Sequence, residues 1–140
     1  SCAGKVRPMP DTQAQLHKQM AVSKISAVER GREAERLAAD WYVRQGAEVL
    51  AMNYRVRGGE IDLIVRDGNC IAFVEVKMRR SDKFGAPAEA VTPAKQRLVS
   101  RTALRYAQEN GLMDEYMRFD VASVYGGQID VIKNAFDFVE

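Results

Sequence analysis

The sequence contains few of the residues on which many enzymes depend. Among its 140 residues there are one histidine, two cysteines and one tryptophan. A single histidine, His17, excludes Ser-His-Asp and Cys-His catalytic machinery and the usual histidine-rich zinc or iron sites. The cysteines, Cys2 and Cys70, are isolated and predict neither a disulfide framework nor a zinc knuckle. Chemistry in this chain would therefore rest on carboxylates and lysines.

Long apolar runs and a secretory pattern are also absent. No apolar stretch approaches the roughly 18–20 residues that cross a bilayer, and the N-terminus lacks a charged segment followed by an apolar one. We therefore expect a cytoplasmic protein with no membrane partner. With 46% apolar residues the chain fits one compact domain over residues 26–140. Residues 1–25 lack a sustained apolar period and are expected to form a tail or a loosely attached helix.

Apolar periodicity and turn signals predict two helices and five strands. A capping box at residues 26–29 and Gly46 delimit a first helix over roughly 27–45, and Thr92 and Pro93 begin a second one that ends at Glu109. Three strands at about 47–56, 59–65 and 71–77 imply an antiparallel meander. The helical crossover after them implies a parallel neighbour, and two strands follow at about 117–125 and 129–139. The expected fold class is α/β, a mixed five-stranded sheet flanked by helices, in the order αβββαββ.

The inner faces of the two helices follow from the same periodicity. The spacing i, i+3, i+4, i+7 predicts that apolar side chains of each helix pack on the sheet. For the first helix these are Ala34, Leu37, Ala38 and Trp41, and for the second Leu98, Val99, Thr102, Ala103 and Tyr106.

The second and third strands carry charges among apolar residues. Side chains alternate between the two faces of a strand, so Glu75 and Lys77 share one face, and Glu60 and Asp62 share a face of the neighbouring strand. The opposite face is apolar, with Ile61, Leu63, Val65, Val74 and Val76. Burying such charges costs several kcal/mol per ion unless they pair or bind a metal. A chain that keeps them there is expected to use them.

The length of the hairpin turn decides whether these charges meet. A two-residue turn at Asp67-Gly68 pairs position i with 135 − i and sets Glu60 opposite Glu75. Asp62 then lies diagonal to Glu75 on the face that also carries Lys77. Carboxylate oxygens beside a lysine suit a hard divalent cation, Mg²⁺ or Mn²⁺, and such an ion would serve phosphodiester hydrolysis. The alternative for Glu75 and Lys77 is a surface pair on an edge strand.

Basic residues are concentrated in the middle of the chain. Residues 76–108 carry 8 basic and 2 acidic side chains, whereas residues 109–140 carry 2 and 7. Such asymmetry indicates a polyanion partner. Arg97, Arg101 and Arg105 recur every four residues along the second helix, with Lys95 and Gln96 in its first turn. Arg79, Arg80, Lys83 and Phe84 on the preceding loop extend the track. The alternative is an arginine-rich helix face that only contacts solvent.

Five motifs in order resemble the YraN-like family of uncharacterised bacterial proteins over about residues 28–125. They are Gly31-Arg32-Glu33-Ala34-Glu35, Asn53-Tyr54-Arg55, Gly59-Glu60-Ile61-Asp62-Leu63-Ile64, Phe73-Val74-Glu75-Val76-Lys77-Met78-Arg79 and Arg118-Phe119-Asp120-Val121. That family is similar to the restriction-endonuclease-like superfamily, nearest to archaeal Holliday-junction resolvases. The superfamily's proline before the first aspartate is replaced here by Ile61.

The resemblance implies a site and an activity. Asp62 and Glu75 would hold the metal, the Val76 carbonyl would complete its shell, Lys77 would be catalytic and Glu35 would be the helical carboxylate. We therefore expect a Mg²⁺- or Mn²⁺-dependent nuclease acting on structured or branched DNA. By analogy, two cuts on two strands favour a homodimer. The alternatives are a non-catalytic nucleic-acid-binding module of a repair or recombination complex and a protein-interaction domain using the acidic C-terminal segment.

Overall fold

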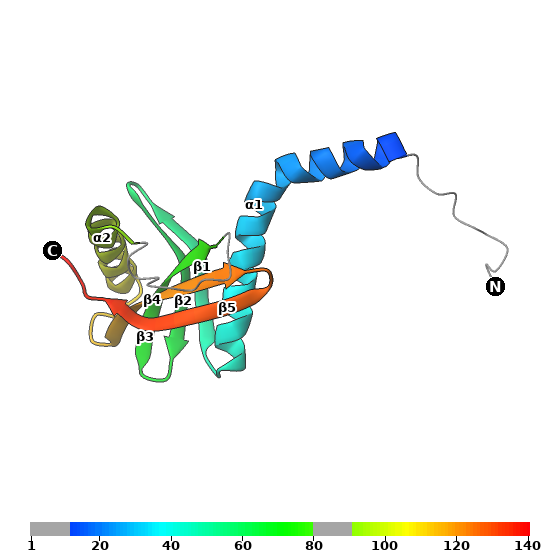
Figure 1. Cartoon of the computed structure of the whole chain (residues 1–140). Helices are drawn as coiled ribbons and strands as arrows, with labels where there is room; N and C mark the ends of the chain where they lie inside the picture. The colour runs from blue at the N-terminus through cyan, green and yellow to red at the C-terminus, as the bar shows by residue number, and fades with distance from the viewer. Residues whose placement is uncertain (1–11, 80–90) are drawn as a thin grey trace. The chain divides into compact units, whose positions relative to one another are not determined.

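The computed structural model describes residues 12–79 and 91–140, and side chains from residue 27 onward. Two helices and five strands form in the expected order (Figure 1): α1 (Thr12–Arg44), β1 (Glu48–Val56), β2 (Gly59–Asp67), β3 (Cys70–Met78), α2 (Pro93–Glu109), β4 (Tyr116–Tyr125) and β5 (Gln128–Phe136). The chain divides into two compact units, Ser1–Arg32 and Glu33–Glu140. The sheet and α2 lie in the second unit, which also contains every site described below.

The five strands form one mixed sheet in the order β1-β2-β3-β4-β5. The pairs β1–β2, β2–β3 and β4–β5 are antiparallel, whereas β3 and β4 are parallel. The predicted α/β class, meander and crossover are therefore confirmed. The reason is that a short turn can join only antiparallel neighbours, while a crossover helix returns the chain in the same direction.

Helices cover both faces of the sheet (Figure 1). Ala38, Ala39 and Tyr42 of α1 pack against one face, in a cluster with Leu63, Val65, Ala72, Val74 and Ala122. Val99, Ala103 and Tyr106 of α2 pack against the other face, in a cluster with Ile61, Ile64, Ile71, Phe73 and Phe119. The central strands are buried on both sides, which is why they read as nearly continuous apolar runs.

Helix α1 begins earlier than the capping box predicted. It starts at Thr12, so the residues at 26–29 lie within the helix instead of at its N-terminus. Residues 12–25 contain no proline or glycine and are rich in alanine, glutamine, lysine and methionine, all of which favour helix. A capping-box sequence therefore does not stop a helix whose preceding residues continue it.

The buried stripes of both helices match the predicted ones in part and differ from them at single positions. On α1 the buried side chains are Ala34, Ala38, Ala39 and Tyr42, whereas Leu37 and Trp41 are only partly buried. On α2, Val99, Thr102, Ala103 and Tyr106 are buried as predicted, but Leu98 is 36% exposed. A shift of one residue rotates a helix face by about 100°, an error that apolar periodicity does not detect when neighbouring positions are both apolar.

The β2–β3 turn lies two residues along from the predicted one. Asp67 pairs with Cys70 and Leu63 with Val74, so positions i and 137 − i are partners and Gly68-Asn69 forms the turn. Gly68 has a φ of +62°, which glycine adopts readily at the first position of a two-residue hairpin turn. The prediction that Glu60 faces Glu75 is therefore wrong. A shift by two residues keeps the parity of the pairing, so the paired residues from Leu63 to Asp67 keep the faces predicted for them.

Neither helix among the described residues has the length and apolar content that a membrane crossing needs.

Candidate functional site

Strand β2 changes its pairing at Asp62. Its neighbours pair regularly with β1, as Ile61 with Tyr54 and Leu63 with Met52, but the ladder to β3 begins only at Leu63. At this point the Oδ2 atom of Asp62 accepts a hydrogen bond from the backbone N–H of Val76 on β3, over 2.8 Å. A side chain thus joins the two strands beyond the end of their backbone pairing.

The alternation of side chains is interrupted at the same place. Ile61 packs in the α2 cluster, whereas Leu63 packs in the α1 cluster, although two residues apart on a regular strand share a face. Asn53, the β1 residue between the partners of Ile61 and Leu63, has a φ of +52°. The expectation that Ile61 and Leu63 line one face is therefore wrong. The local distortion separates β2 from β3 and leaves Asp62 beside the charged end of β3.

Asp62 and Glu75 are electrostatically coupled in a poorly hydrated setting. Glu75 is only 7% exposed. Burial, followed by the negative charges of Glu75, Glu35 and Glu60, raises the pKa of Asp62 to about 7, although the hydrogen bond from Val76 opposes the shift. A carboxyl group with a pKa near 7 exchanges its proton readily at neutral pH and gains from a nearby cation.

Two lysines compensate the charge of Glu75. The Nζ atom of Lys77 lies 3.3 Å from Oε1 of Glu75, and the Nζ atom of Lys95 lies 3.7 Å from the same oxygen. Lys77 comes from β3, two residues beyond Glu75, whereas Lys95 comes from the first turn of α2. Thr92 fixes the start of that helix, because its hydroxyl oxygen accepts a hydrogen bond from the backbone N–H of Lys95 over 3.2 Å. Sequence reasoning placed Lys95 on nucleic acid and missed its contact with Glu75.

Glu35 approaches this group from α1. Its side chain is partly buried, and its Oε2 atom is enclosed with no hydrogen-bond partner among the residues that the structure describes. Its negative charge contributes to the raised pKa of Asp62. An enclosed carboxylate oxygen without a partner is costly, and a bound cation would satisfy it.

The donor set suits a hard cation in kind, but the described residues do not form a complete cage. Asp62, Glu75 and Glu35 offer oxygen atoms only, as Mg²⁺ and Mn²⁺ prefer. In residues 12–79 and 91–140, however, no three acidic, histidine or cysteine side chains stand so that they could hold one ion together. Their arrangement instead couples two carboxylates closely and a third at longer range.

The residues predicted to contact nucleic acid lie in different environments in the structure. Arg79 has its Nε and Nη2 atoms enclosed, with no hydrogen-bond partner in residues 12–79 and 91–140. Gln96 donates a side-chain hydrogen bond to the Val91 carbonyl over 2.9 Å, which fixes it at the start of α2. Arg97 is exposed on α2. Arg80, together with Lys83 and Phe84, lies outside the described residues.

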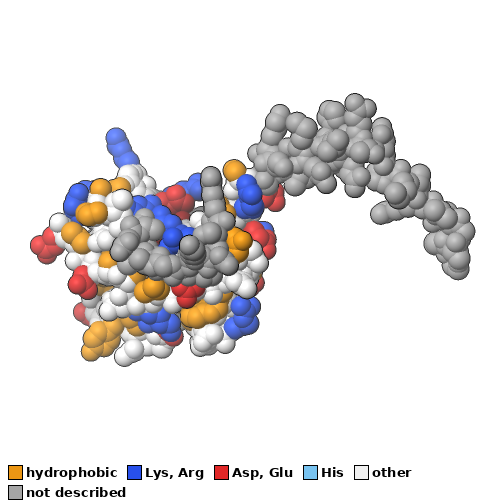
Figure 2. Space-filling view, in the orientation of Figure 1, with side chains coloured by type: hydrophobic (Ala, Val, Ile, Leu, Met, Phe, Trp, Pro, Cys, Tyr) orange, Lys and Arg blue, Asp and Glu red, His pale blue; other side chains and the backbone are white. Residues whose placement is uncertain are grey.

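Arg101 lines a cleft of about 220 Å³ between the β1–β2 turn and α2. The turn contributes residues 56–58 and the helix contributes Leu98, Arg101, Thr102 and Arg105. Figure 2 shows basic side chains at the tip of this hairpin and over α2. Among the described residues no carboxylate lines the cleft, so they offer there neither a carboxylate acid–base group nor carboxylate ligands for a metal ion. The arginine stripe predicted along α2 is thus divided, since Arg97 does not line the cleft.

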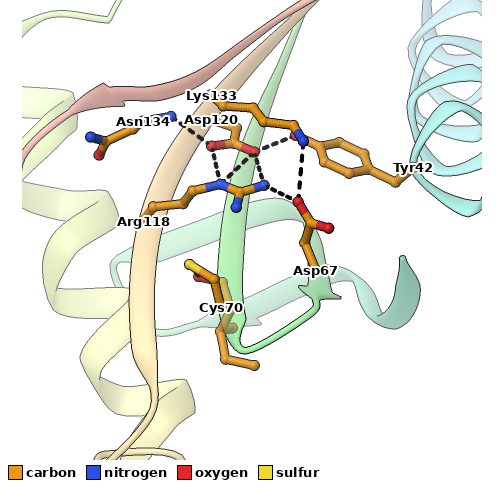
Figure 3. A network of polar contacts seen from close by, with 8 residues as sticks. Tyr42, Asp67, Cys70, Arg118, Asp120, Lys133 and Asn134 are labelled. Carbon is orange, nitrogen blue, oxygen red and sulfur yellow. Dashed lines mark hydrogen bonds and ion pairs between the residues drawn. The ribbon is translucent and has the colours of Figure 1, made fainter. Parts of the chain in front are cut away.

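A second polar cluster lies on the α1 face of the sheet (Figure 3). Asp120 on β4 is fully buried and accepts hydrogen bonds from the Tyr42 hydroxyl over 2.6 Å, from Arg118 Nε over 3.0 Å and from the Asn134 backbone N–H over 2.9 Å. Arg118 also donates to Asp67 over 2.7 Å, and Lys133 donates to Asp67 over 3.2 Å. These contacts join α1, β2, β4 and β5.

The Asp120 cluster is saturated with partners. The hydrogen bond from Arg118 lowers the pKa of Asp67, and burial together with the charge of Asp120 raises the pKa of the Tyr42 hydroxyl. Buried polar groups that all have hydrogen-bond partners hold helices and strands in one arrangement. They leave no unused donor or acceptor for a substrate. We therefore assign this cluster to the fold. Its signal in the sequence was the buried charge pattern of the motif Arg118-Phe119-Asp120-Val121.

Comparisons with known proteins identify relatives of the chain. Residues 34–124 match the model of the uncharacterised protein family UPF0102. The chain is 47% identical over 111 residues to a UPF0102 protein of Syntrophus aciditrophicus, covering 76% of this chain and 87% of that protein. It is 42% identical over 113 residues to one of Thermodesulfovibrio yellowstonii, covering 80% and 99%. The segment that the family model matches contains Glu35, Asp62, Glu75, Lys77 and Lys95. The chain therefore belongs to the uncharacterised protein family UPF0102, the YraN family.

Proposed function

We infer that this protein is a metal-dependent nuclease that hydrolyses phosphodiester bonds in structured or branched DNA. The observation that carries the proposal is the junction of β2 and β3, where Asp62 accepts a hydrogen bond from the Val76 N–H beside the buried Glu75. Two ammonium groups, of Lys77 and Lys95, lie within 4 Å of Glu75. A carboxylate whose pKa lies near neutrality, as for Asp62, and a carboxylate beside lysines, as for Glu75, are groups that phosphoryl chemistry uses.

Asp62, Glu75, Glu35 and the Val76 carbonyl are the groups that would hold Mg²⁺ or Mn²⁺. Two observations support them. The pKa of Asp62 is about 7 because of burial and neighbouring carboxylates, and the enclosed Oε2 atom of Glu35 has no partner. A divalent cation would relieve both. Such an ion supplies Lewis acidity toward the phosphate and a more acidic water.

Lys77 and Lys95 have two possible partners in the proposed reaction, namely Glu75 and the phosphate of the substrate. Both ammonium groups lie beside Oε1 of Glu75, so a cation held by Glu75 would compete with the lysines for one carboxylate oxygen. Lys77 and Lys95 would then be free to contact the phosphate oxygens. Positive charge fixed near the reacting phosphate stabilises the negative charge that develops there, and it does so most effectively where water is excluded.

A cleavage assay tests this proposal. The purified protein is incubated with four-way junction, flap, single-stranded and duplex DNA in Mg²⁺ or Mn²⁺. We expect cleavage of a branched substrate that Asp62→Asn and Lys77→Ala both abolish, with losses on the order of 10²-fold or more, as for groups acting on the transition state. Asp40→Asn serves as the matched control because Asp40 is exposed on α1. Cleavage that persists in Asp62→Asn would refute the assigned site.

A nucleic-acid-binding module without turnover is the second candidate. It is favoured by the pairing of Glu75 with two lysines and by the lack, within the described residues, of three side chains ready to hold one ion. In that case the protein would bind branched DNA equally well with or without a divalent ion. Asp62→Asn would leave binding unchanged, and titration calorimetry would detect no Mn²⁺ uptake by the wild-type protein.

A further inference from the structure

The cleft between the β1–β2 turn and α2 lacks an assigned role. We propose that it binds the phosphate backbone of a nucleic-acid arm, away from the scissile bond, through Arg57, Arg101 and Arg105. This inference rests on the proposed function, because it takes the same polymer as the ligand. It adds Arg57 as a binding residue and groups it with Arg101 and Arg105 of the predicted arginine stripe.

The charges of the cleft are unbalanced. Three of its seven lining residues are arginines and none is acidic. Among the described residues, Arg57 and Arg101 form no ion pair, and Arg105 has only a long contact of 3.8 Å with Glu109, both side chains being half exposed or more. Converging guanidinium groups repel one another, so the arrangement favours an anion between them. A phosphate suits the guanidinium group, which can donate two parallel hydrogen bonds to it.

The close packing of the hairpin on α2 keeps Arg57 near the helix. A Cβ atom on Gly59 would lie 2.0 Å from Oγ1 of Thr102, so only glycine allows the strand to approach the helix this closely. Gly58, with a φ of +85°, turns the chain at the rim of the cleft. Thr102 is itself held, because its hydroxyl donates a hydrogen bond to the Leu98 carbonyl over 2.7 Å. Arg57 is therefore carried by a turn that packs against α2.

The cleft lies on the same stripe of α2 as the lysine of the carboxylate site. Lys95, Leu98, Thr102 and Arg105 follow one another at intervals of three or four residues, which places them on one side of the helix. Arg101 and Arg105 are about 9 and 15 Å along the axis from Lys95, at about 1.5 Å per residue. The rise of a DNA strand is about 3.4 Å per base pair, so this distance corresponds to roughly three to four base pairs.

This continuity identifies the ligand class. A duplex arm that lies along α2 presents phosphates both to Lys95 and to the cleft, whereas a small anion would fill only one of them. Arginine contacts to phosphate carry no base information, so the cleft would position the arm and leave sequence unread. The partly exposed Leu98 adds an apolar surface beside the arginines that suits the sugar of the backbone.

The test measures binding without cleavage. Fluorescence anisotropy with a labelled four-way junction and a labelled duplex is recorded in EDTA over a range of salt concentrations. The variants are Arg57→Ala, Arg101→Ala and the double variant, with Arg44→Ala as a charge-matched control because Arg44 is exposed and outside the cleft. Circular dichroism melting confirms that each variant is folded.

Each single substitution should weaken binding about tenfold and lower the slope of log K against log salt by about 0.9. The double variant should lower the slope by about twice that amount, and Arg44→Ala should change neither quantity. Arg101→Lys should retain the wild-type slope, because the charge is kept. It should lose part of the affinity, because lysine lacks the planar guanidinium group that donates two parallel hydrogen bonds to a phosphate.

The proposal is overturned if the double variant keeps the wild-type affinity and slope, if Arg44→Ala loses as much as Arg57→Ala, or if the wild-type protein binds neither DNA. The results of this binding test and of the cleavage assay separate the present inference from the nuclease proposal. Cleft-dependent binding without cleavage in Mg²⁺ or Mn²⁺ refutes only the nuclease. Cleavage with binding that is insensitive to the cleft refutes only the present inference.

Discussion

Replacing Asp62 by asparagine should make the protein more stable at pH 8 in the absence of divalent ions. In the folded chain the pKa of Asp62 is about 7, raised from 3.8 first by burial and then by the charge of Glu75. Asparagine has nearly the same shape, and its carbonyl oxygen can still accept the hydrogen bond from the Val76 N–H. The substitution therefore removes a destabilising charge while keeping the contact that joins β2 to β3.

The size of the gain follows from the pKa difference. A shift from 3.8 to about 7 corresponds to roughly three pKa units, or a ceiling of about 4 kcal/mol at about 1.36 kcal/mol per unit. Asp62 is only partly buried, and solvent screens part of its interaction with the neighbouring charges. We therefore expect Asp62→Asn to raise the free energy of unfolding at pH 8 by about 1–3 kcal/mol.

The dependence on pH gives the prediction its sign. Between about pH 4 and pH 7 the folded state binds more protons at Asp62 than the unfolded state does, so wild-type stability falls as the pH rises through this window. Below pH 4 the carboxyl group is neutral in both states and the advantage of asparagine should disappear. Above pH 7 the group is ionised in both states and the advantage should reach its full size.

Urea unfolding followed by circular dichroism at pH 4, 6 and 8 measures these differences. Asp40→Asn, at an exposed position of α1, is the control and should change stability by less than about 0.5 kcal/mol at each pH. The reasoning is refuted if Asp62→Asn is destabilising at pH 8, or if its effect is equal at pH 4 and pH 8. Under the nuclease proposal, adding Mn²⁺ at pH 8 should stabilise the wild-type protein and leave Asp62→Asn unchanged.

Three further predictions concern the buried Asp120 network, the packing of Gly59 on α2, and Lys95 beside Glu75. Asp120→Ala should cost about 3–5 kcal/mol in urea unfolding, because it removes the fully buried acceptor of the Tyr42 hydroxyl and of the Asn134 N–H and one of the two carboxylate partners of Arg118. Tyr42→Phe should cost only about 1 kcal/mol, and equal costs would contradict the assigned network. Gly59→Ala should destabilise by about 1–3 kcal/mol by overpacking, and a double-mutant cycle should show that Thr102→Ala recovers part of this loss, since Oγ1 is the nearest atom. Lys95→Met should weaken junction binding in EDTA and, if Glu75 holds a metal, increase Mn²⁺ affinity measured by calorimetry; a decrease in Mn²⁺ affinity would contradict the competition at Oε1.

Much of this molecule could be predicted from its sequence. The order of helices and strands, the meander, the parallel crossover and the burial of both sheet faces all follow from local periodicity and connection length, and all are confirmed. The family is likewise confirmed, because its motifs are continuous stretches of the chain. The parity of the hairpin survived a turn displaced by two residues, so the faces of the paired residues of β2 and β3 were predictable, whereas the break in alternation at Asp62 was not.

Only the tertiary structure decided which groups meet. The sequence placed Lys95 beside a phosphate, but the packing of α2 on the sheet brings its ammonium group to Glu75. Tyr42 rather than Trp41 is the aromatic residue buried in full, because its hydroxyl reaches Asp120, 78 residues away. Periodicity along one element determines what that element buries, whereas contacts between elements depend on rotations and registers that no single segment encodes.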